Sequence, residues 1–399
     1  MTENKKIKVA LILERANVAL GGAERSIFEL RMALSALGLD VIILAAKGNT
    51  DSKKIQILCQ SKTGKRVGFL AFKRALKKHL AQNSYDIIHS VLPFNFADVY
   101  QPRGGSFVEA VIQNAESYQN RLLTSYKKTT AFANYRRTIL LRAERKLCRK
   151  SKGPLVLALS RYVAEQFRKH YNLAPERIVI IPNGVKTNKP VDSEQADKLR
   201  AQILAQLHLK EADNPVFFLF VANNFRLKGL SSLIKAMHLA LPEKTDRKPY
   251  LVVAGSAPTH KYRSLAKKCR VQNKIIFIGP VRKIQNALAI TDVAVLPTFY
   301  DPSSRFILEA LAAQKPVITT TFNGATDMFV ENRHGKVIDT PENITALAQA
   351  ISYFTDTENI QKASRAIVED NIKGKISISN VAKSLESLYE QILEKRRFL

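Results

Sequence analysis

Two carboxylates eight residues apart stand out as candidates for chemistry. Asp301 lies in a polar loop, and Glu309 follows inside a segment, 306–312, that is otherwise apolar. A carboxylate among apolar side chains is costly unless a hydrogen bond or an ion pair satisfies it. Sugar hydroxyls would satisfy Glu309, and so would a neighbouring Arg or Lys. Ser303 or Ser304 can cap the helix that this apolar segment predicts.

A cationic turn is the second candidate. Asn224, Arg226 and Lys228 follow the apolar run 216–222 and precede a helical pattern that begins near Gly229. Two cations at the carboxyl end of a strand, beside a helix N-terminus, suit a phosphate or diphosphate. An ordinary solvated turn explains the same residues equally well.

Three further positions in the N-terminal half are candidates for binding. Gly21 and Gly22 precede a helix, so backbone N–H groups there could approach an anion, although a ligand-free tight turn is the alternative. His89 ends a short strand and could face an acceptor or be a core histidine. Arg103 lies in a second Gly-Gly turn and could bind an acidic or phosphorylated acceptor, or be an ordinary loop arginine.

The elements that must position these residues alternate between strand and helix. Such alternation predicts parallel sheets with helical crossovers, and ligands then bind at the carboxyl ends of the strands. Two series occur, so we expect an α/β protein with two Rossmann-like domains, residues 1–185 and 186–379. The last helix, about 380–399, could close the second domain or pack on the first. The expected strands are 7–13, 41–46, 86–90, 155–159 and 178–181, then 216–222, 250–254, 274–278, 292–296, 316–320 and 335–338.

Composition and charge narrow the class of protein. The 399 residues are 46% hydrophobic, which excludes a disordered chain, and no apolar run is long enough to span a membrane. Three widely spaced cysteines form neither a disulfide framework nor a metal cluster, so a reducing cytoplasm is expected. The net charge of +29 implies a polyanionic partner: nucleic acid, an acidic membrane surface or a phosphorylated substrate.

Much of the positive charge gathers in two segments. Residues 61–80 hold seven basic and no acidic groups, and residues 121–152 hold eleven basic groups and one acidic group, Glu144. A helix over 66–80 would place Phe69, Phe72 and Leu76 on one side and basic residues on another. A basic amphipathic helix is typical of binding to an anionic membrane surface. The alternative is that the apolar residues are core and the charges are solvated.

Several short segments, taken together, resemble the signature of the family 4 glycosyltransferases. No single segment is decisive, but they occur in the family's order over about residues 7–350. The resemblance implies a GT-B fold, with two Rossmann-like domains facing a central cleft, retention of anomeric configuration and no metal. The segments are 21–24, 181–185, 228–229, 253–256, 278–280 and 295–297, and the acidic-x7-Glu motif 301–309 with the Ala-Leu-Ala-Ala-Gln-Lys-Pro-Val-Ile run that follows it.

The resemblance also implies roles for single residues. Glu309 would bind the ribose hydroxyls of a nucleotide sugar donor, and Asp301 would hold a hydroxyl of the transferred sugar. Most of the family has Glu at the first position, and Asp is one methylene shorter. Lys228, helped by Arg226, would neutralise the leaving diphosphate, although the family's arginine usually lies elsewhere in this turn. The other implied donor-binding positions are Gly21, Gly22, Asn224, Gly255, Pro280, Ser303, Ser304 and Arg305.

Within the family, the chain resembles the lipopolysaccharide core glucosyltransferases in segments 124–132, 167–171 and 225–229. This implies transfer of a hexose, from UDP by resemblance, to a lipid-linked glycan at the inner face of the cytoplasmic membrane. No resident cofactor is expected. The competing hypotheses are a nucleic-acid-binding protein that uses the basic surface, and another GT-B enzyme such as a nucleotide-sugar epimerase. The sequence lacks Trp and any recognised nucleic-acid module, and we therefore expect no nucleic-acid partner.

Overall fold

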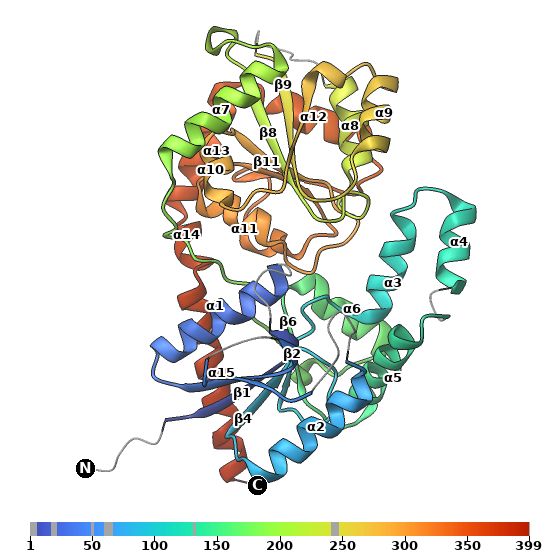
Figure 1. Ribbon diagram of the computed structural model, residues 1–399, viewed down its shortest axis with the longest axis vertical. Coiled ribbons are helices and arrows are strands. Elements are labelled where there is room, and N and C mark those ends of the chain that lie inside the picture. The colour runs from blue at the N-terminus through green and yellow to red at the C-terminus, as the bar shows by residue number, and fades with distance from the viewer. Residues whose placement is uncertain are drawn as a thin grey trace. The chain divides into compact units, whose positions relative to one another are not determined.

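The computed structural model describes residues 6–16, 22–48, 52–59, 67–130, 133–240 and 247–398. These residues form two compact units, each built on a parallel sheet (Figure 1). The first unit comprises residues 1–112, 125–184 and 377–399, and the second comprises 113–124 and 185–376.

The sheet of the first unit has seven strands in the order β3-β2-β1-β4-β5-β6-β7, and every neighbouring pair is parallel. The short strands β3 and β5 were not expected from the sequence, because two or three residues carry no readable period. The strands are β1 (Lys8–Ala16), β2 (Asp40–Gly48), β3 (Ile55–Ile57), β4 (Ile87–Ser90), β5 (Val99–Tyr100), β6 (Leu155–Ala158) and β7 (Ile178–Ile180). The helices are α1 (Gly22–Ala36), α2 (Phe69–Gln82), α3 (Phe107–Glu116), α4 (Arg121–Thr130), α5 (Tyr135–Arg149), α6 (Arg161–Tyr171) and α15 (Ile378–Arg397).

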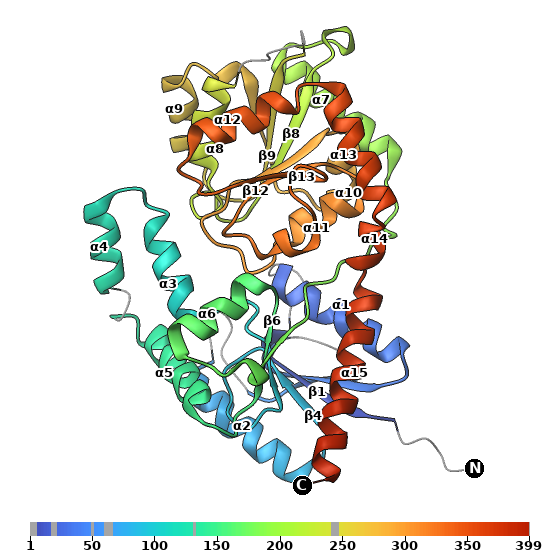
Figure 2. The ribbon, with the colours of Figure 1, turned by 180° about the vertical axis from the view of Figure 1, so that it is seen from behind.

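Strand β1 shows why this sheet is covered on both faces. Successive side chains of a strand point to opposite faces. Val9 and Leu11 pack with helices α1 and α15, whereas Ala10 and Ile12 pack with α2 and with Leu140 of α5. Helix α15 therefore packs on the first unit, beside α1 (Figure 2), which decides the alternative that the sequence left open.

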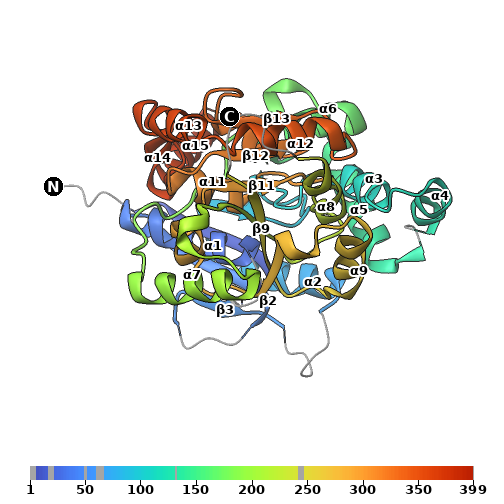
Figure 3. The same ribbon diagram turned by 90° about the horizontal axis from the view of Figure 1, so that it is seen from above.

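The second sheet has six parallel strands in the order β10-β9-β8-β11-β12-β13. Helices α8, α9 and α12 gather on one side of it and α7 and α13 on the other (Figure 3), and α10 contacts α7. The strands are β8 (Val216–Val221), β9 (Pro249–Ala254), β10 (Ile275–Gly279), β11 (Val293–Leu296), β12 (Val317–Thr320) and β13 (Gly335–Ile338). The helices are α7 (Ser193–Leu207), α8 (Leu230–Leu239), α9 (His260–Lys268), α10 (Ile284–Ala289), α11 (Arg305–Ala312), α12 (Ile344–Tyr353), α13 (Thr357–Glu369) and α14 (Ile372–Lys375).

Segment 113–124 differs from the chain on either side of it in the unit to which it belongs. The expectation placed it in the N-terminal domain, whereas its contacts place it in the second unit. Its residues contact Arg226 and Ser232 of the second unit, and a local sequence pattern does not reveal these contacts.

His89 is a core residue of the first unit. Its side chain is fully buried, and its Nδ1 lies 2.6 Å from the hydroxyl oxygen of Tyr389 on α15. Burial, with a smaller contribution from the nearby charge of Arg103, lowers the pKa of His89 to about 3. The expected contact with an acceptor has no support here, because no part of this side chain reaches the surface.

The buried His89 should make the protein sensitive to acid. The folded state keeps His89 neutral down to a pKa of about 3, whereas its ordinary pKa is 6.5. Between these values the unfolded chain binds more protons, so stability falls as the pH falls. We expect this one group to remove up to about 1.4 kcal/mol of unfolding free energy per pH unit.

Urea unfolding of the wild type and His89→Gln between pH 6.5 and 4.5 tests this expectation. The variant should show the weaker loss of stability on acidification. Glu144 contributes in the opposite direction, because burial raises its pKa to about 7, but both chains contain Glu144 and its contribution cancels in the comparison. Equal pH dependence of the unfolding free energy in the wild type and His89→Gln would contradict the lowered pKa assigned to His89.

Candidate active site

The cationic turn of the second unit is built from residues 223–229, which connect β8 to α8. Asn224 organises it: its Oδ1 accepts a hydrogen bond from the Leu227 amide at 3.2 Å, and its carbonyl accepts one from the Lys228 amide at 3.0 Å. Gly229 closes the turn with a φ of +78°, where a Cβ atom would lie 1.9 Å from the carbonyl oxygen of Pro297. Only glycine allows this approach to the end of β11.

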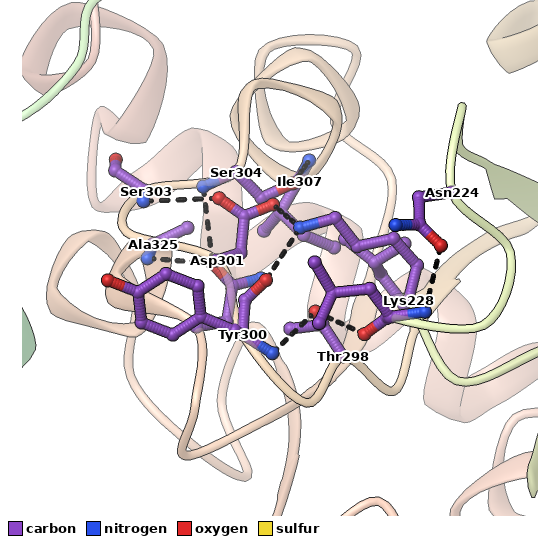
Figure 4. Close-up of polar contacts among 12 residues, drawn as sticks. Asn224, Lys228, Thr298, Tyr300, Asp301, Ser303, Ser304, Ile307 and Ala325 are labelled. Carbon is purple, nitrogen blue, oxygen red and sulfur yellow. Dashed lines mark hydrogen bonds and ion pairs between the residues drawn. The ribbon is translucent and has the colours of Figure 1, made fainter. Parts of the chain in front are cut away.

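Lys228 and Asp301 form the central ion pair of the site (Figure 4). Lys228 Nζ lies 2.6 Å from Asp301 Oδ2 and donates a second hydrogen bond, of 2.8 Å, to the carbonyl of Tyr300. The other carboxylate oxygen of Asp301 accepts a hydrogen bond from the Ser303 amide at 3.2 Å. The side chains of Lys228 and Asp301 are 20% and 16% exposed, so the pair is largely shielded but can be reached from solvent.

The start of α11 lies directly beside this pair. Ser304 caps the helix by accepting a hydrogen bond from the Ile307 amide, as expected from the sequence. Asn323 was not anticipated: its buried side chain accepts hydrogen bonds from the amides of Ser304 and Ala325 and donates to Thr319. Asn323 therefore fixes the loop in which Asp301 lies. An Asn three residues beyond a strand gives no sequence signal specific enough to predict this role.

Glu309 is satisfied by cations in this structure. Its Oε1 lies 3.2 Å from Arg305 Nη2 and 3.4 Å from Lys189 Nζ, and its side chain is 12% exposed. This is the ion-pair alternative that the apolar surroundings of Glu309 left open. The carboxylate oxygens of Glu309 can also accept hydrogen bonds from a hydroxyl-bearing ligand.

The next two strands contribute their carboxyl ends to the same edge of the sheet. Gly255 follows β9 with a φ of +149°, and a Cβ atom there would lie 1.9 Å from the carbonyl oxygen of Ala222. Its amide donates to the carbonyl of Gly279 at 2.8 Å, which joins the ends of β9 and β10. Pro280 follows and is exposed. Gly255 and Pro280 thus lie at the expected edge, as a nucleotide-binding role requires.

Arg226 is engaged with segment 113–124 of the second unit. Its guanidinium donates hydrogen bonds to Asn114 and Ser117, and its Cζ lies 3.8 Å from the centroid of the Tyr118 ring. The sequence suggested that Arg226 helps to neutralise a diphosphate. The structure instead gives it partners within the protein, which a reading limited to residues 223–229 could not reveal.

Some of the candidate binding residues of the first unit lie outside the part of the chain that the structure describes. Gly21 lies outside the described residues, and Gly22 is the first residue of α1. Arg103 donates hydrogen bonds to the side chains of Ser26, on α1, and Gln101. Residues 61–66 and 131–132 of the basic segments also lie outside the described residues.

Two features are absent from the part of the chain that the structure describes. No group of three or more His, Cys, Asp or Glu side chains there could hold a metal ion. No helix there has the length and hydropathy needed to cross a bilayer.

Comparison with known families places the site in context. The sequence model of "Glycosyl transferases group 1" matches residues 206–374, and that of "Glycosyltransferase Family 4" matches residues 20–189. The first match spans the Lys228–Asp301 pair and Glu309. The chain is a glycosyltransferase of the GT-B type.

Relatives of this glycosyltransferase span nearly its whole length. It is 26% identical to the lipopolysaccharide glucosyltransferase WaaG of Escherichia coli K12, over 80% of this chain and 82% of WaaG. A crystal structure of WaaG matches the fold with a TM-score of 0.67 at 21% identity, covering 97% of this chain and 98% of that one. Sucrose-phosphate synthase from Thermosynechococcus elongatus matches with a TM-score of 0.75 at 19% identity, covering 98% and 100%.

A third structure that matches the fold holds UDP-glucose. Anabaena HepE in complex with UDP-glucose has a TM-score of 0.66 at 16% identity, and the match covers 98% of this chain and 100% of that one. At these identities the structural matches show the fold alone.

The close approach of Gly229 to β11 gives a stability prediction. In Gly229→Ala, the new Cβ would collide with the Pro297 carbonyl and the residue would be forced to keep a positive φ. We expect a loss of about 2–4 kcal/mol in unfolding free energy, measured by denaturant unfolding.

Gly104→Ala is the matched control. A Cβ there meets no heavy atom within 4 Å, and φ lies outside the positive region. Its unfolding free energy should change by less than about 0.5 kcal/mol. A Gly229→Ala variant as stable as the control would show that the turn is not held against β11.

Proposed function

We propose that this glycosyltransferase moves a hexose, with retention of anomeric configuration and without a metal ion, from a UDP-sugar to a hydroxyl of a membrane-linked glycan such as a lipopolysaccharide core. The observation that carries the proposal is the placement of Lys228 Nζ, 2.6 Å from Asp301 and beside the start of α11. A fixed cation and a helix N-terminus together form a site for a diphosphate.

The Lys228–Asp301 ion pair implies how the nucleotide sugar would bind. A diphosphate next to Lys228 competes with Asp301 for the ammonium group, because Lys228 can move a hydrogen bond from the carboxylate to a phosphate oxygen. Asp301 Oδ2 then becomes free to accept a hydrogen bond from a hydroxyl of the sugar. Donor binding thus replaces an internal ion pair by two contacts with the ligand.

The chemistry follows from the charge that develops on the leaving group. The bond between the anomeric carbon and the diphosphate oxygen breaks, and negative charge grows on the diphosphate. Lys228 and the positive end of the α11 helix dipole stabilise that charge, and because both are already in position, little reorganisation is needed. The acceptor oxygen bonds to the same face of the anomeric carbon, and its proton passes to a phosphate oxygen. Atoms and charge therefore balance without an added base.

Glu309, Gly255 and Pro280 complete the donor site in this proposal. Glu309 accepts hydrogen bonds from the ribose hydroxyls while Arg305 and Lys189 remain its ion-pair partners. Gly255 and Pro280 border the base. UDP is supported by the likeness to HepE, which binds UDP-glucose, and the glycan acceptor by the likeness to WaaG, a lipopolysaccharide glucosyltransferase.

The acceptor side of the proposal places the enzyme at the inner face of the cytoplasmic membrane. Helix α4 exposes Leu122, with 84% of its surface accessible, and Tyr126, with 58%. The charged residues of α5 add exposed cations, among them Arg142 and Arg149. Exposed apolar side chains with neighbouring cations suit an anionic lipid surface. Arg103 would serve a phosphorylated or acidic acceptor.

The donor site is tested by ligand-induced thermal stabilisation. Wild type, Lys228→Gln and Glu309→Ala are compared in the presence of UDP, UDP-glucose, GDP and ADP. A ligand at about 100 times its dissociation constant adds about 2.7 kcal/mol to the stability of the folded state. We expect the uridine compounds to stabilise the wild type, and both variants to lose that stabilisation.

Glu194→Ala is the control, since Glu194 is an exposed carboxylate, paired with Lys198, on α7. It should respond like the wild type. Stabilisation by an oligonucleotide and by no nucleotide would favour the nucleic-acid-binding hypothesis. Conversion of UDP-glucose to another UDP-sugar without an acceptor would favour the epimerase.

Membrane binding is tested by sedimentation with vesicles of phosphatidylglycerol and phosphatidylethanolamine. The double variant Arg142→Glu/Arg149→Glu should bind at least tenfold more weakly than the wild type, because each cation near an anionic surface contributes about 1 kcal/mol. Lys362→Glu/Lys373→Glu, the same charge change at exposed sites of the second unit, is the control. Equally weakened vesicle binding by both double variants would indicate that binding depends on net charge alone and not on the cations of α5.

A further inference from the structure

Segment 113–124 is attached to the second unit although its chain neighbours on both sides belong to the first. The chain enters the second unit within α3 and leaves it within α4. Besides Arg226, the segment contacts α8, where Gln119 Nε2 donates to the buried hydroxyl of Ser232 at 3.2 Å. The segment therefore packs against the turn that carries Lys228 and against α8, the helix that follows it.

The guanidinium group of Arg226 is contacted both at its terminal nitrogens and on one face of its plane. One terminal nitrogen donates to the Asn114 carbonyl at 2.8 Å and to the Ser117 hydroxyl, and the other donates to Asn114 Oδ1 at 3.3 Å. The ring of Tyr118 covers the guanidinium at 3.8 Å. A planar fork that is hydrogen-bonded at its end and stacked on one face is held in a single orientation.

The backbone of Arg226 is bonded to the same turn. Its carbonyl accepts a hydrogen bond from the amide of Gly229 at 3.1 Å, across Lys228. Fixing the side chain of Arg226 thus fixes one end of the short loop from which the Lys228 side chain extends. The pKa of Arg226 is lowered by burial, while the charges of Tyr118 and Tyr262 raise it.

We infer that Asn114, Tyr118 and Arg226 form a clasp that positions the cationic turn, so that Arg226 acts through Lys228 and does not contact the diphosphate. The inference rests on the proposed function, because it assigns Lys228 to the donor. It makes Tyr118 and Asn114, which lie more than a hundred residues before the turn, positioning residues for the transfer reaction.

Tyr118→Ala and Tyr118→Phe separate this role from simple packing. Phenylalanine keeps a ring beneath the guanidinium, whereas alanine removes it. We expect Tyr118→Ala to weaken UDP binding by about tenfold and to lower kcat/KM for UDP release from UDP-glucose by a similar factor. Tyr118→Phe should stay within about threefold of the wild type. Equal losses in the two variants would overturn the clasp.

Arg226→Lys tests how the arginine acts. A cation that contacts the diphosphate would be replaced well by lysine, but an ammonium group cannot reproduce the forked, stacked contacts. We expect Arg226→Lys to lose as much UDP affinity as Tyr118→Ala, and the double variant to lose no more than either single variant. Wild-type affinity in Arg226→Lys, or losses that add in the double variant, would contradict the inference.

Lys228→Gln separates failure of this inference from failure of the proposed function. If Lys228→Gln binds UDP as tightly as the wild type, the donor assignment itself is wrong. If Lys228→Gln loses affinity and Tyr118→Ala does not, the donor assignment stands and the clasp is wrong. Asn114→Ala, which removes one side-chain hydrogen bond, replaces Tyr118→Ala if that variant does not fold, and the loss of UDP affinity is then expected to be smaller, about threefold.

Discussion

The candidate site depends on one packing constraint, the contact between the chain that leaves β8 and the chain that leaves β11. These strands are neighbours in the sheet although about seventy residues separate them. Gly229 lies so close to the Pro297 carbonyl that no side chain fits between them. That approach brings Lys228 within 2.6 Å of Asp301. The ion pair, the position of α11 and the proposed diphosphate site all follow from it.

Charge is arranged in the site so that every fixed ion already has a partner. Asp301 holds Lys228, and Arg305 and Lys189 hold Glu309. Partly buried ions without partners would be costly, so this pairing stabilises the site. It also sets the condition for binding, since a donor must offer contacts at least as good as those it replaces. In the proposed function, a nucleotide sugar meets this condition with an anion for Lys228 and hydroxyls for the carboxylates.

The first unit uses buried polar groups for a different purpose. His89 and Tyr389 join β4 to α15, the helix that returns from the end of the chain. Glu144 of α5 accepts hydrogen bonds from Tyr100 and Tyr171 and from the Phe107 amide at the start of α3. Both groups fix helices that come from distant parts of the sequence. Neither has a path to solvent, so we interpret them as structural groups.

The sequence by itself determined the two alternating series of strands and helices, because buried parallel strands must be apolar and the turns between them must be polar. It also located Lys228, Asp301, Ser304 and Glu309, because charged and capping residues at the carboxyl ends of strands are recognisable within a short window. Tertiary structure alone decided that α15 packs on the first unit, that Asn323 fixes the Asp301 loop, and that Arg226 binds Asn114 and Tyr118. These pairings join residues with no constraint on their spacing, so only the folded chain reveals them.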